Sequence, residues 1–173
     1  MPRSTGLSGL EYAYQSPGLS AFHRYGVTYA LTLGSWLQLS ANVMTSAMTG
    51  LRSSIYGDFS GEIAVSRDRQ LSASYAPAVR IGHRFNNQRF KLDTQWSWQH
   101  REFTTLGQGM SDNNVHHKLS VRLTLPKIDQ WRTTLTASHN RSWKGKNIFS
   151  KKLNVTRALG QDWEFSLNMT HYN

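Results

Sequence analysis

Long stretches of this sequence alternate strictly between apolar and polar side chains, and this alternation limits the folds open to the chain. From Val115 to Leu125, the odd positions carry Val, His and Leu, whereas the even positions carry His, Lys, Ser, Arg and Thr. Successive side chains of a β-strand point to opposite faces, so the pattern predicts strands with one apolar face and one wet face. Long segments of this kind are 71–85, 88–99, 115–125, 131–143 and 147–159.

Turn signals separate the alternating segments. Examples are Tyr56-Gly57-Asp58, Pro126 to Asp129 and Gly160-Gln161-Asp162, and a longer Gly- and Asn-rich link runs from about Thr104 to Asn114. No segment keeps a 3.6-residue period for more than about two turns. We therefore expect residues 1–173 to form one all-β unit, an antiparallel meander of about 10–11 long strands. Pro77 falls in the middle of a predicted strand and indicates a bulge there.

Strand length and the composition of the wet face favour a portion of a transmembrane β-barrel. Strands of soluble proteins centre on about 5–6 residues, whereas membrane strands need about 9–11. A sandwich of this many long strands needs apolar inner faces, but a barrel with lipid outside and water inside does not. Aromatic residues near segment ends fit an interfacial girdle, although they also fit a soluble core. These aromatic residues are Trp96, Trp98, Trp131, Trp143, Trp163 and Tyr172.

Composition excludes several other classes. The chain has 20 Lys+Arg against 10 Asp+Glu, a formal net charge of +10, and no Cys. The absence of Cys excludes a disulfide framework and a thiolate metal site. There is no apolar run of about 18 residues for a transmembrane helix, and no signal peptide is visible. We interpret most of the cations as solvated barrel and turn residues. Those assigned to loops are Lys144, Lys146, Lys151 and Lys152.

Signals for catalysis are absent from the sequence. It contains no Gly-x-Ser-x-Gly elbow, no P-loop and no dinucleotide fingerprint. His116 and His117 are adjacent, and in a regular strand they would point to opposite faces, so they would not ligate one ion together. We expect no enzymatic activity, no cofactor and no metal site.

The stretch from Ser20 to Gln38 resembles the fimbrial outer-membrane ushers of chaperone–usher secretion. It has an aromatic and a basic residue before Tyr-Gly, and then Leu-Thr-Leu-Gly followed by an aromatic residue and Gln. The turn Tyr56 to Phe59, the strand end Ala64 to Asp68, and Phe103 to Gly107 are also similar to usher segments. The residues that carry the main motif are Phe22, Arg24, Tyr25, Gly26, Leu31, Thr32, Leu33, Gly34 and Gln38.

The resemblance implies a portion of a larger outer-membrane barrel, lying after the plug insertion. No plug and no N- or C-terminal periplasmic domain is recognisable. An usher does no covalent chemistry; it is a channel through which pilus subunits leave as they polymerise by β-strand addition. The implied partners are periplasmic chaperone–pilin subunit complexes, translocating pilus subunits and outer-membrane lipid, not nucleic acid.

In such a barrel, the apolar face meets lipid and the polar face lines the lumen. A hydrated lumen lets a folded protein pass without sticking, because large apolar patches bind partners. The lumen-facing candidates are Arg80, Arg84, Lys91, Asp93, Gln95, Lys118, Ser120, Arg122 and Arg132.

Two alternatives stay open. One is a complete small outer-membrane porin or adhesin barrel. The other is a soluble basic β domain that binds nucleic acid or polysaccharide. The positive net charge and the aromatic residues on strands support this alternative. Such binding platforms carry aromatics and cations on one face, whereas Trp96 and Phe165 alternate away from Lys91 and Arg122.

Overall fold

The computed structural model describes residues 18–69, 74–106, 115–126, 128–129, 131–158 and 164–173, and within these ranges the protein is all-β. Ten strands follow one another along the chain. They are β1 (Leu19–Thr28), β2 (Leu31–Leu39), β3 (Val43–Ser54), β4 (Gly57–Asp68), β5 (Ala76–Asn86), β6 (Lys91–Gln99), β7 (Val115–Thr124), β8 (Trp131–Ser142), β9 (Asn147–Ala158) and β10 (Glu164–Tyr172).

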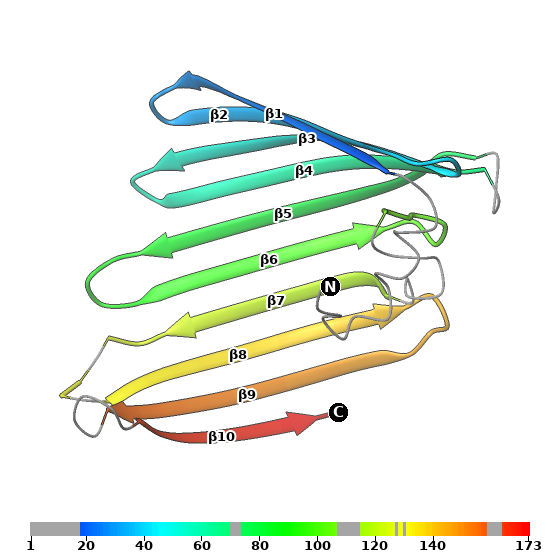
Figure 1. Ribbon diagram of the computed structural model, residues 1–173. Coiled ribbons are helices and arrows are strands. Elements are labelled where there is room, and N and C mark those ends of the chain that lie inside the picture. Colours follow the sequence, from blue (N-terminus) through cyan, green and yellow to red (C-terminus); the bar gives the residue numbers. More distant parts are fainter. Residues whose placement is uncertain (1–17, 70–73, 107–114, 127, 130, 159–163) are drawn as a thin grey trace, which may run out of the picture.

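Each strand pairs antiparallel with the next one in sequence, and the sheet order runs from β1 to β10 without a crossover (Figure 1). The predicted all-β antiparallel meander is confirmed, and the predicted long segments correspond to β5–β9. Three predicted features lie outside the described residues: the start of segment 71–85, most of the link 104–114, and the turn Gly160-Gln161-Asp162 with Trp163.

Tight turns set the register of the first hairpins. Ile55 and Tyr56 join β3 to β4, and Gly57 follows at φ 107°. A Cβ atom at Gly57 would also collide with the carbonyl oxygen of Arg84 on β5. Glycine is therefore required at this turn both by its backbone conformation and by the close approach of the neighbouring strand.

The sheet is a single curved layer (Figure 1). β1 and β10 each have one neighbour, so the sheet is not closed within the described residues. The buried hydrophobic residues are few and mostly small: Ala47, Ala64, Ala76 and Phe103. A β-sandwich buries a continuous apolar layer between two sheets, and the described part of the chain has none. No described helix is long and apolar enough to cross a membrane.

Two local predictions were wrong. β5 begins at Ala76, so Pro77 is its second residue, and it pairs with Val65 without a register shift. Proline is tolerated near a strand start, where fewer ladder bonds are lost, so no bulge forms there. Lys151 and Lys152 lie inside β9 rather than in a loop, because both pair in register with residues of β8 and β10 although two adjacent lysines interrupt the alternation. Lys144, by contrast, lies in the β8–β9 turn.

Candidate functional site

The strand register sorts the side chains into two faces. Directly paired residues lie on the same face of a sheet, and Thr124 of β7 pairs with Lys91 of β6 and with Thr134 of β8. Pairs of this kind place all nine lumen-facing candidates on one face; their role at a lumen remains a prediction. They are Arg80 and Arg84 on β5, Lys91, Asp93 and Gln95 on β6, Lys118, Ser120 and Arg122 on β7, and Arg132 on β8.

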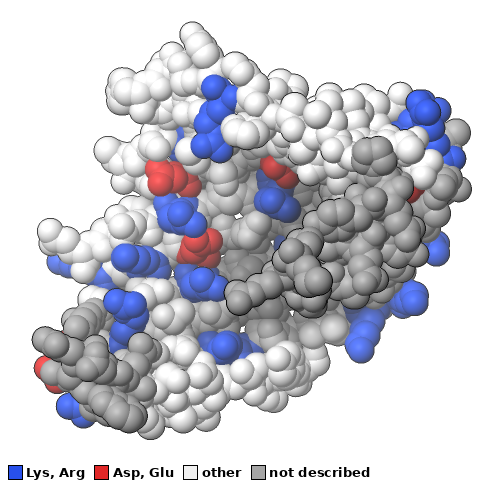
Figure 2. Space-filling model, in the orientation of Figure 1, with Lys and Arg blue, Asp and Glu red and all other residues white. Residues whose placement is uncertain are grey.

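This polar face is the concave one. Figure 2 looks into the hollow of the sheet, where Lys, Arg, Asp and Glu side chains gather. Thr45 and Ser66, which pair with each other on this face, are fully buried. Met48 and Ile63 pair on the opposite face and are 73% and 67% exposed. The two faces therefore differ both in chemistry and in what covers them.

Across β4 to β6, four charged residues of the concave face form two ion pairs. Arg84 donates from Nε to Asp93 Oδ2 at 3.1 Å, and its Nη2 lies 3.1 Å from the same oxygen. Arg80 Nη1 lies 3.8 Å from Glu62 Oε1, and Trp36 Nε1 on β2 donates to Glu62 Oε2 at 3.2 Å. These pairs are partly exposed, so each contributes at most about 1 kcal/mol. They nevertheless hold carboxylates and guanidinium groups at fixed positions in the hollow.

The segment after β6 folds back over the concave face. The Thr45 hydroxyl donates to the carbonyl oxygen of Thr104 at 2.9 Å, and the Thr104 N–H donates to Ser66 Oγ at 3.0 Å. Phe103 packs with Ala47 and Ala64 in the small buried cluster. Because Thr45 and Ser66 are fully buried, these hydrogen bonds fix residues 100–106 against β3 and β4. The sequence indicated a link after β6 but not its packing against β3 and β4. Thr and Ser are common on the polar face of any strand, so they do not reveal a specific hydrogen-bond partner.

Farther along the sheet, the concave face carries cations without acids. A pocket of about 770 Å³ spans the hollow from the β5–β6 turn to β9. Four cations on its wall, Lys91, Arg122, Arg132 and Lys152, are exposed, and no Asp or Glu is among the described lining residues. None of the four forms an ion pair with a described residue. We call this feature the basic pocket. Lys152 was missed as a site residue because it was assigned to a loop.

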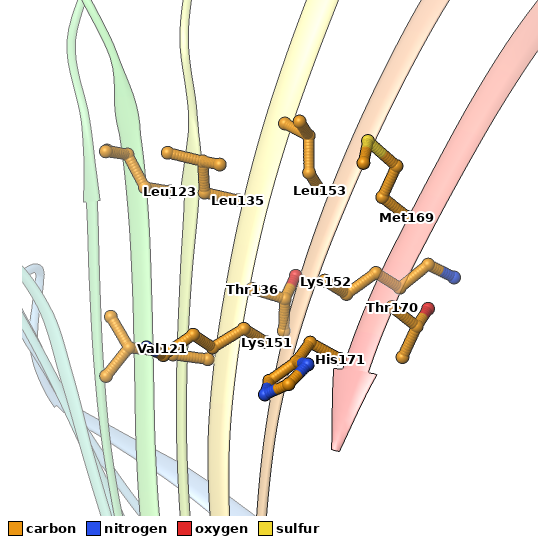
Figure 3. A pocket seen from close by; sticks show the side chains of 11 residues that line it. Val121, Leu123, Leu135, Thr136, Lys151, Lys152, Leu153, Met169, Thr170 and His171 are labelled. Carbon is orange, nitrogen blue, oxygen red and sulfur yellow. The ribbon is translucent and has the colours of Figure 1, made fainter. Parts of the chain in front are cut away.

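The convex face is apolar over most of its extent. Register places Leu123, Leu135, Leu153 and Met169 in one row across β7–β10. Figure 3 shows these four side chains lying in line, beside a groove of about 610 Å³. Lys151 interrupts the face, with its Nζ lying 5.3 Å from the Phe149 ring centroid. Lys can keep an alkyl stem along an apolar surface while its ammonium reaches water. The register also places four arginines on this face, each within the last three residues of its strand: Arg52, Arg67, Arg141 and Arg157. The middle of the strands therefore stays mostly apolar on this side.

The motif residues of the resemblance build the β1–β2 hairpin. Phe22 pairs with Trp36, and Arg24 pairs with Gly34. A Cβ atom at Gly34 would lie 2.7 Å from Thr49 Oγ1, so glycine permits the close contact of β2 with β3. Gln38 Oε1 accepts from the Leu106 N–H at 3.3 Å, which ties the hairpin to the returning segment.

The described aromatic residues of the predicted girdle lie mostly at strand ends. Trp131 begins β8, Trp143 directly follows it, Trp98 is the penultimate residue of β6, and Tyr172 ends β10. Trp96 lies farther inside β6. The register places Trp98 and Trp131 on the convex face, but Tyr172 pairs with Ser150 on the concave face and so does not belong to a lipid-facing girdle. A girdle formed by the other aromatic residues remains a prediction.

His116 and His117 do not point to opposite faces as expected. The register shifts between Val115 and His117, and the two rings lie 4.3 Å apart between centroids. The bulge turns the side chains toward each other, and Trp143 packs on His116 at 4.5 Å. Among the described residues, no group of three or more His, Asp or Glu side chains is placed to hold a metal ion. We interpret the pair as part of an aromatic cluster at the start of β7.

Comparison of the sequence with protein-family models found no match, and comparison with curated proteins found none either.

Proposed function

We propose that this chain forms part of the wall of an outer-membrane β-barrel of the fimbrial usher type, a channel for the secretion and assembly of pilus subunits. The observation that carries the proposal is the single curved layer with an apolar convex face and a hydrophilic concave face. In water, the uncovered apolar face would be costly, because each exposed Leu or Ile forgoes about 1.5–3 kcal/mol of burial. Hydrocarbon outside and water inside remove that cost for both faces.

Strand length supports a membrane location. β3, β4, β8 and β9 have 12 residues each, and β6 has 9. A tilted membrane strand needs about 9–11 residues to cross the hydrocarbon. The outer edges of β1 and β10 have no partner strand within the described residues, and they need one in lipid, because an open edge there leaves backbone groups without hydrogen bonds. Further strands of a larger barrel would provide them.

The usher assignment itself rests on the resemblance of the β1–β2 hairpin. In this proposal, the concave face is the passage for subunits delivered by periplasmic chaperones, and the polar lining keeps folded subunits from adhering. The convex face contacts outer-membrane lipid. The chain performs no covalent chemistry in this role.

Two single-cysteine variants test the proposal, since the chain contains no Cys. Gln95→Cys places a thiol on the concave face and Ile63→Cys places one on the convex face, near the middle of β6 and β4. In outer membranes of pilus-producing cells, we expect Gln95→Cys to react with a water-soluble maleimide and to crosslink to passing pilus subunits. Ile63→Cys should do neither. Equal maleimide labelling of both thiols would contradict the membrane location, and absence of a subunit crosslink at Gln95→Cys would contradict the usher role.

A further inference from the structure

The basic pocket has a floor of hydroxyl groups and a rim of cations. Thr124 and Thr134 pair across β7 and β8, with their Oγ1 atoms 3.4 Å apart. Lys91 is the neighbour of Thr124 on β6, and Arg122 lies two residues before it on the same face. Neighbouring strands are about 4.8 Å apart, and same-face residues along a strand are about 7 Å apart. The cations therefore surround the two threonines at spacings of roughly 5–10 Å.

One row of paired residues explains why two of these cations, Arg122 and Lys152, have no acidic partner. Crossing from β4 to β7, it reads Asp58, Arg84, Asp93, Arg122, so acid and base alternate. The alternation stops there, because Arg122 next pairs with Thr136, and Thr136 pairs with Lys152. Asp93, the one acid beside Arg122, is already bound by Arg84 through two nitrogen atoms. Arg122 and Lys152 thus stand about 10 Å apart with a hydroxyl between them.

We propose that the basic pocket binds an extended acidic stretch of polypeptide, whose carboxylates take the positions that acids occupy elsewhere in this row. In an extended peptide, side chains at i and i+2 point the same way about 7 Å apart. That repeat matches the spacing of the cation rows within the reach of Lys and Arg side chains. Carboxylates form bidentate pairs with Arg, and the threonine hydroxyls and Asn154 on the pocket wall offer further hydrogen bonds.

Other anions fit less well. The pocket opens on the concave face, opposite the apolar side chains, so a lipid headgroup in the surrounding bilayer would not reach it. A single phosphate is too small to bridge cations about 10 Å apart. Single-stranded nucleic acid binds by stacking its bases on several aromatic side chains. Phe90 is the one aromatic residue among the described lining residues. Its ring already packs against Phe85, with the ring centroids 5.5 Å apart. The identity of the peptide as part of a translocated protein rests on the proposed function; the pocket does not.

Peptide binding to the whole chain in detergent micelles tests the inference. The probe is a fluorescent ten-residue poly-glutamate peptide followed by anisotropy, with inorganic phosphate and a ten-nucleotide DNA strand as competing probes. We expect binding that weakens steeply with salt. Arg122→Gln/Lys152→Gln should lower the affinity about tenfold or more, since two charge-assisted contacts are lost. Lys144→Gln/Lys146→Gln removes the same charge from the β8–β9 turn and should change the affinity less than about twofold.

Each outcome decides the matter. Absent binding, or equal losses in the two double variants, would overturn the site. Tighter binding of the DNA strand, or complete competition by equimolar phosphate, would overturn the acidic peptide as its occupant. If circular dichroism shows that Arg122→Gln/Lys152→Gln does not fold, the single variant Lys91→Gln replaces it, with an expected loss of about threefold. The maleimide pattern at Ile63→Cys and Gln95→Cys is independent of peptide binding, so failure of this inference and failure of the proposed function give different results.

Discussion

The two halves of the concave face share one strand register and treat charge in opposite ways. Over β3–β6, the acids Glu62 and Asp93 are each bound by an arginine of β5, and Thr45 of β3 pairs with Ser66 of β4. Over β6–β9, Arg122 and Lys152 have only threonine between them. We call these regions the paired half and the basic half. Both halves pair in regular antiparallel register at these positions, so the difference lies in which side chains the sequence places at the polar positions.

The halves also differ in what covers them. Residues 100–106 lie over the paired half, where Thr45 and Ser66 hold Thr104 by both its carbonyl oxygen and its N–H. The described residues place no such segment over the basic pocket, whose cations are exposed. A face whose hydrogen bonds and charges are satisfied internally contributes to stability, whereas a face with unsatisfied charge is available to a ligand. Within one sheet, the paired half thus stabilises the fold, whereas the basic half is the region that we propose for peptide binding.

The largest effect on stability is expected in the paired half. Thr45→Val keeps the shape of the side chain but removes the hydroxyl that donates to Thr104, leaving a buried carbonyl oxygen without that bond. We expect the free energy of unfolding to fall by about 1–3 kcal/mol, measured by urea unfolding in detergent with tryptophan fluorescence. The matched change in the basic half, Thr134→Val, should cost less than about 1 kcal/mol, because that hydroxyl is half-buried and its contact is longer. Equal losses would mean that the returning segment is not held as described.

A single substitution, Thr136→Glu, should give the basic half an ion pair like those of the paired half. Thr136→Glu inserts a carboxylate between Arg122 and Lys152, which are its partners on β7 and β9. Stability should rise slightly, by about 0.2–1 kcal/mol, as expected for an opposite-charge cross-strand pair. Affinity for the poly-glutamate peptide should fall about tenfold, since the new side chain occupies the place of the ligand. Thr136→Gln has nearly the same size without the charge, and retained peptide affinity in that control would assign the loss to charge.

The strands were predictable because an apolar/polar alternation that continues for about ten residues is typical of a β-strand and of no other regular structure. Segment 115–125 alternates without a break, and β7 follows it closely. The shared face of the nine polar candidates was predictable for the same reason, because parity along each strand fixes its face once neighbouring strands are in register.

Contacts that depend on irregular backbone were not predictable. The bulge beside His116 turns two adjacent rings together, and no alternation pattern encodes it. The return of Phe103 and Thr104 over β3 and β4 joins residues far apart in sequence through Thr and Ser hydroxyls, which on any wet strand look alike. The basic pocket likewise needed the cross-strand register, since its cations come from β6, β7, β8 and β9.

The smallest change in affinity is expected for Arg84→Gln, which lies where the paired half meets the basic half. Arg84→Gln removes the two nitrogen contacts to Asp93 and leaves that carboxylate free to pair with Arg122 across β6 and β7. Stability should change by less than about 1 kcal/mol, because the Arg84–Asp93 pair is largely exposed. Peptide affinity should nevertheless fall about twofold to threefold, because Asp93 then competes for Arg122. The double variant Arg84→Gln/Asp93→Asn removes the competitor and should restore the affinity. If the double variant binds as weakly as the single one, Asp93 does not compete for Arg122, and the two halves are electrostatically independent.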